Sequence, residues 1–168
     1  MAKAILTAER LRELLHYDPD TGIFTRRVRT STSTRVGEVA GTVRGTGGYR
    51  CVPVDGKRYA EHRLAWFYVY GRWPTEQIDH INGIRIDNRI VNLRDASGSM
   101  NRENQRAARS DNRSSGILGV CYCKLHKKWK ASIRVKGVLK HIKYCATAEE
   151  ARDAYIRAKR ALHEGCTI

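Results

Sequence analysis

Hydrophobic and polar positions along this chain alternate in short stretches, which predicts several small elements. Residues 7–15 have the spacing of a short helix, with Thr7 as its N-cap and an apolar face made by Leu11, Leu14 and Leu15. Residues 17–22 are rich in turn formers, and Ile23-Phe24-Thr25 after them indicate a strand.

The middle of the chain predicts a hairpin followed by a helix. Residues 49–54 and 57–60 have strand patterns, and they flank Asp55-Gly56, which is a strong signal for a tight hairpin turn. Residues 64–68 then follow a helical period that ends at Gly71.

The last third of the chain predicts a β-β-β-α module. A polar segment at 109–116 has no apolar period and is interpreted as a linker. Strands are expected at 117–123, 128–135 and 138–144, and a capping-box sequence at 147–150 opens a helix. One face of that helix would carry Ala151, Ala154, Tyr155, Ala158, Ala161 and Leu162, and its small alanines would let the helix lie close to a sheet.

Composition adds a strong positive charge to this pattern. The 168 residues carry a formal net charge of +15, which indicates a polyanionic partner and favours nucleic acid. Residues 109–168 hold 14 Lys and Arg against 5 Asp and Glu, whereas residues 51–108 hold 9 against 7. The least basic third is where a cation site is expected.

Other classes of protein fit the sequence poorly. No run of 18 apolar residues indicates a membrane span, and the N-terminus lacks a secretory pattern. The five cysteines form no regular framework, which predicts reduced thiols and a cytosolic protein.

Candidate chemistry is concentrated around Asp79 and His80, which end a short apolar run. Asp79 offers a hard anionic oxygen, and Asn101 offers a neutral amide oxygen from a helical segment further along the chain. Together they could hold Mg²⁺, or Mn²⁺, while His80 removes a proton from a water molecule. This set suits hydrolysis of a phosphodiester bond.

Asn88 and Asn92 lie in the loop between these residues, where buried amides can pin a loop by bonding backbone groups at both ends. Taken singly, each Asn is more often an ordinary turn residue, and an Asp-His pair is more often an exposed ion pair. His62 could contact a phosphate or be a buried, hydrogen-bonded histidine, and Arg63 could do either.

Residues 44–108 resemble the HNH endonuclease family, in the branch found among phage and intron-homing enzymes. The matching text is EHRLAW at 61–66, WP at 73–74, IDHING at 78–83, DNRIVNLR at 87–94, and Asn101. The resemblance implies a two-stranded hairpin and a helix around one divalent ion. It assigns the general base to His80, the loop-fixing role to Asn92, and metal binding to Asp79 and Asn101.

Residues 114–163 resemble the DNA-binding domain of plant ethylene-response factors, which reads DNA with a three-stranded sheet. The matching text is SGILGV at 115–120, WKASIR at 129–134, and TAEEA at 147–151 through Ala154-Tyr155. Strand alternation divides the sheet into a face toward the helix and a face toward DNA. The DNA-contacting residues expected are Lys130, Ser132, Arg134, His141 and Lys143, together with Arg63 in the preceding domain.

The fold class expected is therefore α+β. A small α/β-hairpin region at 1–43 precedes an HNH ββα-metal nuclease core at 44–108. The linker at 109–116 leads to a three-stranded antiparallel sheet plus helix at 117–168.

The function expected is that of a metal-dependent DNA endonuclease of the homing type, with a His general base and one divalent cation. The alternative is a DNA-binding regulatory or accessory protein whose nuclease centre is inactive. The partner expected is double-stranded DNA and not a membrane, with the protein acting as a monomer. We expect the protein to be encoded by a phage or mobile element and to act in the cytoplasm of a bacterial host.

Overall fold

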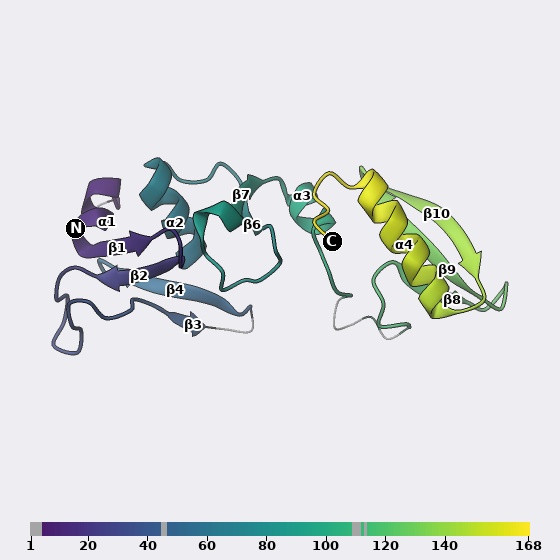
Figure 1. Cartoon of the computed structure of the whole chain (residues 1–168), viewed down its shortest axis with the longest axis horizontal. Coiled ribbons are helices and arrows are strands. Elements are labelled where there is room, and N and C mark those ends of the chain that lie inside the picture. The colour runs from purple at the N-terminus through teal and green to yellow at the C-terminus, as the bar shows by residue number, and fades with distance from the viewer. Residues whose placement is uncertain (1–4, 45–46, 109–111, 113) are drawn as a thin grey trace. The chain divides into compact units, whose positions relative to one another are not determined.

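The computed structural model describes residues 5–44, 47–108, 112 and 114–168 (Figure 1). The chain divides into two compact units, residues 1–96 and 97–168, and each is described by itself. Three residues of the expected linker, 109–111, and a fourth, Arg113, lie outside the described residues.

The first unit begins with a short helix and an antiparallel pair of strands. Helix α1 (Ala8–Leu14) starts at Thr7, whose side chain accepts a hydrogen bond from the amide of Arg10, as the capping pattern predicts. Strands β1 (Leu15–Asp18) and β2 (Ile23–Arg26) pair in antiparallel fashion around the expected turn.

A three-stranded antiparallel sheet follows, in the order β3 (Thr42–Arg44), β4 (Tyr49–Val54) and β5 (Lys57–Ala60). The turn between β4 and β5 contains Asp55 and Gly56, both with positive φ, which explains the preference for this dipeptide there. Helix α2 (Glu61–Tyr70) then ends at Gly71 in the left-handed conformation, as expected.

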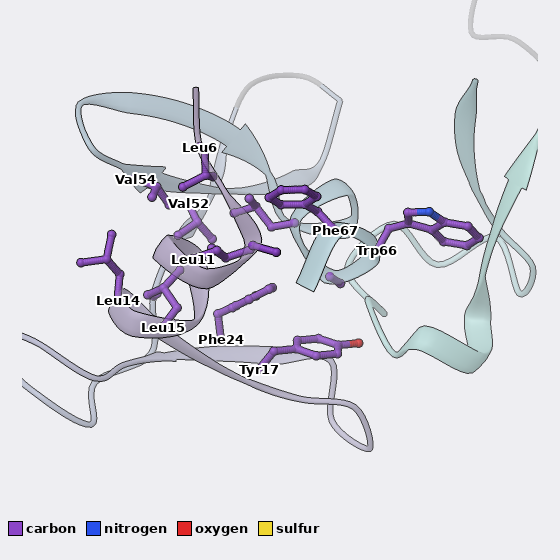
Figure 2. Packing of buried hydrophobic residues seen from close by; sticks show 14 of the residues in the cluster. Leu6, Leu11, Leu14, Leu15, Tyr17, Phe24, Val52, Val54, Trp66 and Phe67 are labelled. Carbon is purple, nitrogen blue, oxygen red and sulfur yellow. The ribbon is translucent and has the colours of Figure 1, made fainter. Parts of the chain in front are cut away.

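A further antiparallel hairpin completes the first unit. Strand β6 (Gln77–His80) pairs with β7 (Leu93–Ala96), and a 3₁₀-helix (Ile90–Asn92) lies just before β7. One hydrophobic core joins the N-terminal elements to this region, since its buried members run from Leu6 to Leu93. Figure 2 shows side chains of α1, β1, β2, β4 and α2 converging in this core.

The second unit contains a sheet covered by a helix. Its strands are β8 (Val120–Cys123), β9 (Lys128–Val135) and β10 (Val138–Cys145), and the antiparallel order is β10-β9-β8. Helix α4 (Ala148–Leu162) lies along one face of the sheet (Figure 1), with Ala151, Ala154 and Tyr155 buried against it. Thr147 caps this helix, as expected.

The helix face differs from the expected one at its C-terminal end. Lys159 is buried, at 1% exposure, whereas Ala161 and Leu162 are exposed. The lysine stem packs inward because its ammonium group donates a hydrogen bond to the carbonyl of Gln105, which follows helix α3 (Gly98–Glu103).

Helix α3 belongs to the second unit and contacts the residues after α4. The amide of Gly165 donates to the carboxylate of Glu103 at 3.2 Å, and the Thr167 hydroxyl donates to the Asn104 side chain at 2.5 Å. Arg106 in turn donates to the Thr167 hydroxyl at 2.6 Å. The short α3 therefore depends on partners more than 60 residues away in the sequence.

The α+β expectation is confirmed at the level of mixed helices and small antiparallel sheets. The finer architecture and the domain limits at 43/44 and 108/109 stay predictions. Across the part of the chain that the structure describes, no helix has both the length and the apolar character needed to cross a membrane.

Candidate active site

The β6–β7 hairpin places Asp79 and His80 side by side at the end of β6. Register pairs Asp79 with Arg94 and His80 with Leu93. Both side chains are buried, at 4% exposure each. The Arg94 guanidinium contacts Asp79 Oδ2 through Nε at 2.8 Å and Nη2 at 2.6 Å, so the carboxylate oxygen is held by an ion pair across the hairpin.

His80 lies among aromatic and amide groups. Its Nε2 is 3.1 Å from Asn88 Oδ1, and its ring lies 5.2 Å from that of His62 and 5.9 Å from that of Tyr49. Burial lowers the pKa of His80, and the hydrogen bond to Asn88 and the charge of Asp79 oppose this shift. The imidazole is therefore neutral near pH 7, which is the form that accepts a proton.

The loop between β6 and β7 is held by Asn92, as its predicted loop-fixing role requires. Asn92 Oδ1 accepts from the amide of Asn82 at 2.9 Å, and Asn92 Nδ2 donates to the carbonyl of Asp87 at 2.8 Å. Asp87 also forms a close ion pair with Arg89, and these hydrogen bonds lower the pKa of its carboxyl to about 2. The loop thus has bonds at both ends that keep the His80 surroundings in place.

Asn101 lies on α3 in the second unit. Ser97 caps this helix by accepting from the amide of Met100 at 3.2 Å. The position of one unit relative to the other is not determined, so the joining of Asn101 to Asp79 and His80 stays a prediction. Among the described residues, no three His, Cys, Asp or Glu side chains gather as a metal-binding cluster.

Glu61, to which no role was assigned from the sequence, is fully buried, and its carboxylate bonds to Asn88 of the His80 loop. Its Oε2 accepts from Arg50 Nε at 2.6 Å and from Asn88 Nδ2 at 3.0 Å. A charged residue in the first turn of a helix is usually exposed, so only its place in the text EHRLAW pointed to it.

His62 is partly buried, and its Nδ1 has no hydrogen-bond partner among the described residues. Burial lowers the pKa of His62 to about 4, and the neighbouring His80 and Arg63 add to the effect. Arg63, which is predicted to contact DNA, donates a hydrogen bond to the carbonyl of Glu76 at 3.2 Å within the protein.

The outer face of the β8–β10 sheet carries most of the predicted DNA contacts. Lys130, Ser132 and Arg134 alternate with the helix-facing Ala131 and Ile133, and His141 is the cross-strand partner of Ser132. Arg134 Nη1 donates to the carbonyl of Gly137 at 2.7 Å.

The regular pairing of β10 with β9 is interrupted before Lys143, whose role as a DNA contact stays a prediction. A register shift between His141 and Lys143 pairs Lys143 with Ala131, which faces the helix, and makes Tyr144 the cross-strand neighbour of Lys130. An extra residue in one strand breaks the two-residue period, and the sequence carries no sign of it. Lys143 is still exposed, at the edge strand.

Comparison with known protein families gives a match over the β6–β7 hairpin and its flanking elements, not over the β8–β10 sheet. Residues 59–105 match the family model described as HNH endonuclease. An HNH endonuclease domain is therefore present there, and it contains Asp79, His80, Asn88, Asn92 and Asn101. No curated protein and no solved structure matches the chain.

Proposed function

We propose that this protein is a metal-dependent DNA endonuclease in which His80 is the general base. One observation carries the proposal: the HNH match covers a buried, neutral imidazole, held at Nε2 by Asn88 and next to a buried carboxylate. Such a group can take a proton near neutral pH without first losing one to solvent.

The step proposed for His80 is proton transfer during hydrolysis of a phosphodiester. The imidazole accepts a proton from a water molecule while the water oxygen forms a bond to phosphorus. The bond from phosphorus to the leaving oxygen breaks, and that oxygen takes a proton from solvent. The imidazolium then returns its proton to solvent, which restores the neutral base.

The donor chemistry of Asp79 and Asn101 fits a hard divalent cation such as Mg²⁺ or Mn²⁺, since both offer oxygen. The ion pair with Arg94 is one contact that would compete with a cation for Asp79. A bound cation would supply charge stabilisation at the phosphate and the leaving oxygen. In this proposal Asp79 and Asn101 hold the ion, and His80 stays free of it.

The second unit is proposed to hold double-stranded DNA. Residues 109–168 carry 14 of the 32 Lys and Arg, and the outer sheet face presents Lys130, Arg134 and His141. The resemblance to ethylene-response factors supports the same face. A homing-type enzyme of phage or mobile-element origin, acting as a monomer in a bacterial cytoplasm, is the proposed setting.

Supercoiled plasmid incubated with the full chain tests this function. We expect nicked or linear product with Mg²⁺ or Mn²⁺ and none with EDTA. Retained DNA binding without cleavage, with either metal and over a range of plasmid sequences, would contradict the proposal and favour the regulatory alternative. Absence of both binding and cleavage would contradict both.

A further inference from the structure

Three rings form a row on the outer face of the β8–β10 sheet, which is the face opposite to helix α4. The centroid of the Tyr144 ring lies 4.5 Å from that of His126 and 4.5 Å from that of His141. Both imidazoles are exposed, and Tyr144 is half-buried. These rings have polar edges, and a row of them that no helix covers suits contact with another molecule.

The register shift in β10 brings His141 and Tyr144 to the same face. In a regular strand, residues three positions apart point to opposite faces. Here His141 is the cross-strand partner of Ser132, and Tyr144 is that of Lys130. Ser132 and Lys130 alternate with helix-facing residues of β9, so both point outward. An extra residue in a strand re-aims the side chains after it, and in β10 this adds Tyr144 to the row.

Tyr144 also contacts strand β8. Burial and the neighbouring Cys123 thiol raise the pKa of the Tyr144 hydroxyl. The hydroxyl therefore keeps its proton and can donate a hydrogen bond to a bound molecule. The nitrogens of an imidazole can donate and accept, so the ring row as a whole can do both.

The charged side chains around the ring row are all positive. Residues 117–146, which include the whole sheet, hold 8 Lys and Arg and no Asp or Glu. Lys128, Lys130 and Arg134 lie on the outer face of β9. In nucleic-acid complexes such cations hold phosphates, whereas base edges are read by groups that donate and accept hydrogen bonds. The outer face offers both kinds of group.

We propose that His126, His141 and Tyr144 contact base edges of duplex DNA and set its sequence preference, while the surrounding Lys and Arg side chains hold phosphates. This inference rests on the proposed binding of double-stranded DNA by the sheet. It does not depend on cleavage.

Selection of duplexes from a random-sequence library by the full-length protein tests the inference. EDTA is present throughout, so metal-dependent cleavage cannot affect the result. The best selected duplex and a scrambled duplex of the same composition are then compared in a binding assay across a salt series. We expect the wild type to bind the selected duplex more tightly by about tenfold or more.

The double variant His126→Ala, His141→Ala changes only exposed side chains, so its fold should be kept. Its affinity for the selected duplex should fall by about 10- to 100-fold, the range for lost base contacts. Its affinity for the scrambled duplex should stay within about twofold, and its salt slope should not change. Tyr144→Phe keeps the ring and loses the hydroxyl, so it should show a smaller loss of the same kind.

A second pair of variants provides the comparison. Lys128→Ala, Lys130→Ala should weaken binding to both duplexes equally and should lower the salt slope by about 0.9 for each lost phosphate contact. His16→Ala removes an exposed imidazole on β1 and should match the wild type.

Four results would overturn the inference. The wild type could show no preference for the selected duplex, or it could bind single-stranded DNA of the same sequence more tightly. The imidazole double variant could bind both duplexes as the wild type does, or it could lose affinity for both equally with a lower salt slope, as phosphate contacts would. If plasmid is not cleaved while selection and variants behave as expected, the nuclease function fails and the base contacts stand. If plasmid is cleaved and the double variant keeps the wild-type preference, the reverse holds.

Discussion

The individual side chain that matters most to the proposed reaction is His80. His80→Ala should lower plasmid cleavage by about 10²–10⁴-fold, the usual contribution of a positioned general base, while DNA binding stays within about twofold. His16→Ala is the matched control, because His16 is an exposed imidazole on β1. Gel-shift and cleavage assays on the same preparations check both statements. Wild-type cleavage by His80→Ala would exclude His80 as the base.

His62 gives a prediction for stability. Its pKa is about 4 in the folded protein and near 6.5 when exposed, so the unfolded chain binds the proton more readily. The stability gained from neutral His62 is complete above pH 6.5 and is lost as the pH falls from about 6.5 to about 4. Between pH 7 and pH 5 the loss should be about 2 kcal/mol.

Urea unfolding at these two pH values, followed by amide signals of α2, measures the effect. His62→Phe removes the titrating group but keeps a ring of similar size, so its stability should fall less than that of the wild type over this interval. His16→Ala should keep the wild-type difference. Equal pH dependence in His62→Phe and the wild type would show that another group is responsible.

The sequence predicted those site residues whose chemistry is visible in one short segment. Asp79, His80 and Asn92 stand within 14 positions of one another, and the bonds made by Asn92 agree with its loop-fixing role. Glu61 could not be assigned in the same way. It meets Asn88 across 27 residues, and only the packing of α2 against the His80 loop reveals the contact.

Among helices and strands, the features set by local chemistry were predictable. The caps at Thr7 and Thr147, the left-handed Gly71 and the Asp55-Gly56 turn each depend on one to four neighbouring residues. The register shift in β10 and the burial of Lys159 involve partners that are distant in the sequence, so residue periodicity alone could not reveal them.

The contact between α3 and the residues after α4 leads to a prediction about Gly165. A Cβ at this position would lie 2.4 Å from the carbonyl oxygen of Met100 and 3.0 Å from the Cβ of Glu103. Gly165→Ala should therefore push the chain away from α3 and break the bond from Gly165 to Glu103.

Hydrogen exchange at the amides of Asn101 and Asn104, which close the turns of α3, measures this effect. We expect protection to fall by about tenfold or more, because α3 has no buried residues of its own. Glu164→Ala, at the exposed neighbouring position, should leave exchange unchanged. Unchanged protection in Gly165→Ala would mean that α3 does not depend on this contact.

At the scale of the whole protein, residues 114–168 have two roles: they are proposed to bind DNA, and they contact helix α3. Residues 114–168 contain the basic sheet, and they also contain Lys159, Gly165 and Thr167, which bond to residues 103–106. Removing this segment should therefore affect two properties at once, DNA affinity and the helix that carries Asn101.

The two effects can be separated by comparing that deletion with a Lys130→Ala, Arg134→Ala variant of the full chain. Both should weaken DNA binding, and each lost phosphate contact should reduce the slope of log affinity against log salt by about 0.9. Only the deletion should also abolish hydrogen-exchange protection of α3, and with it the metal-dependent cleavage in which Asn101 is proposed to take part. If the deletion keeps cleavage at high protein concentration, α3 folds without its partners in the second unit. If the surface variant keeps the full salt slope, DNA is held by another face of the molecule.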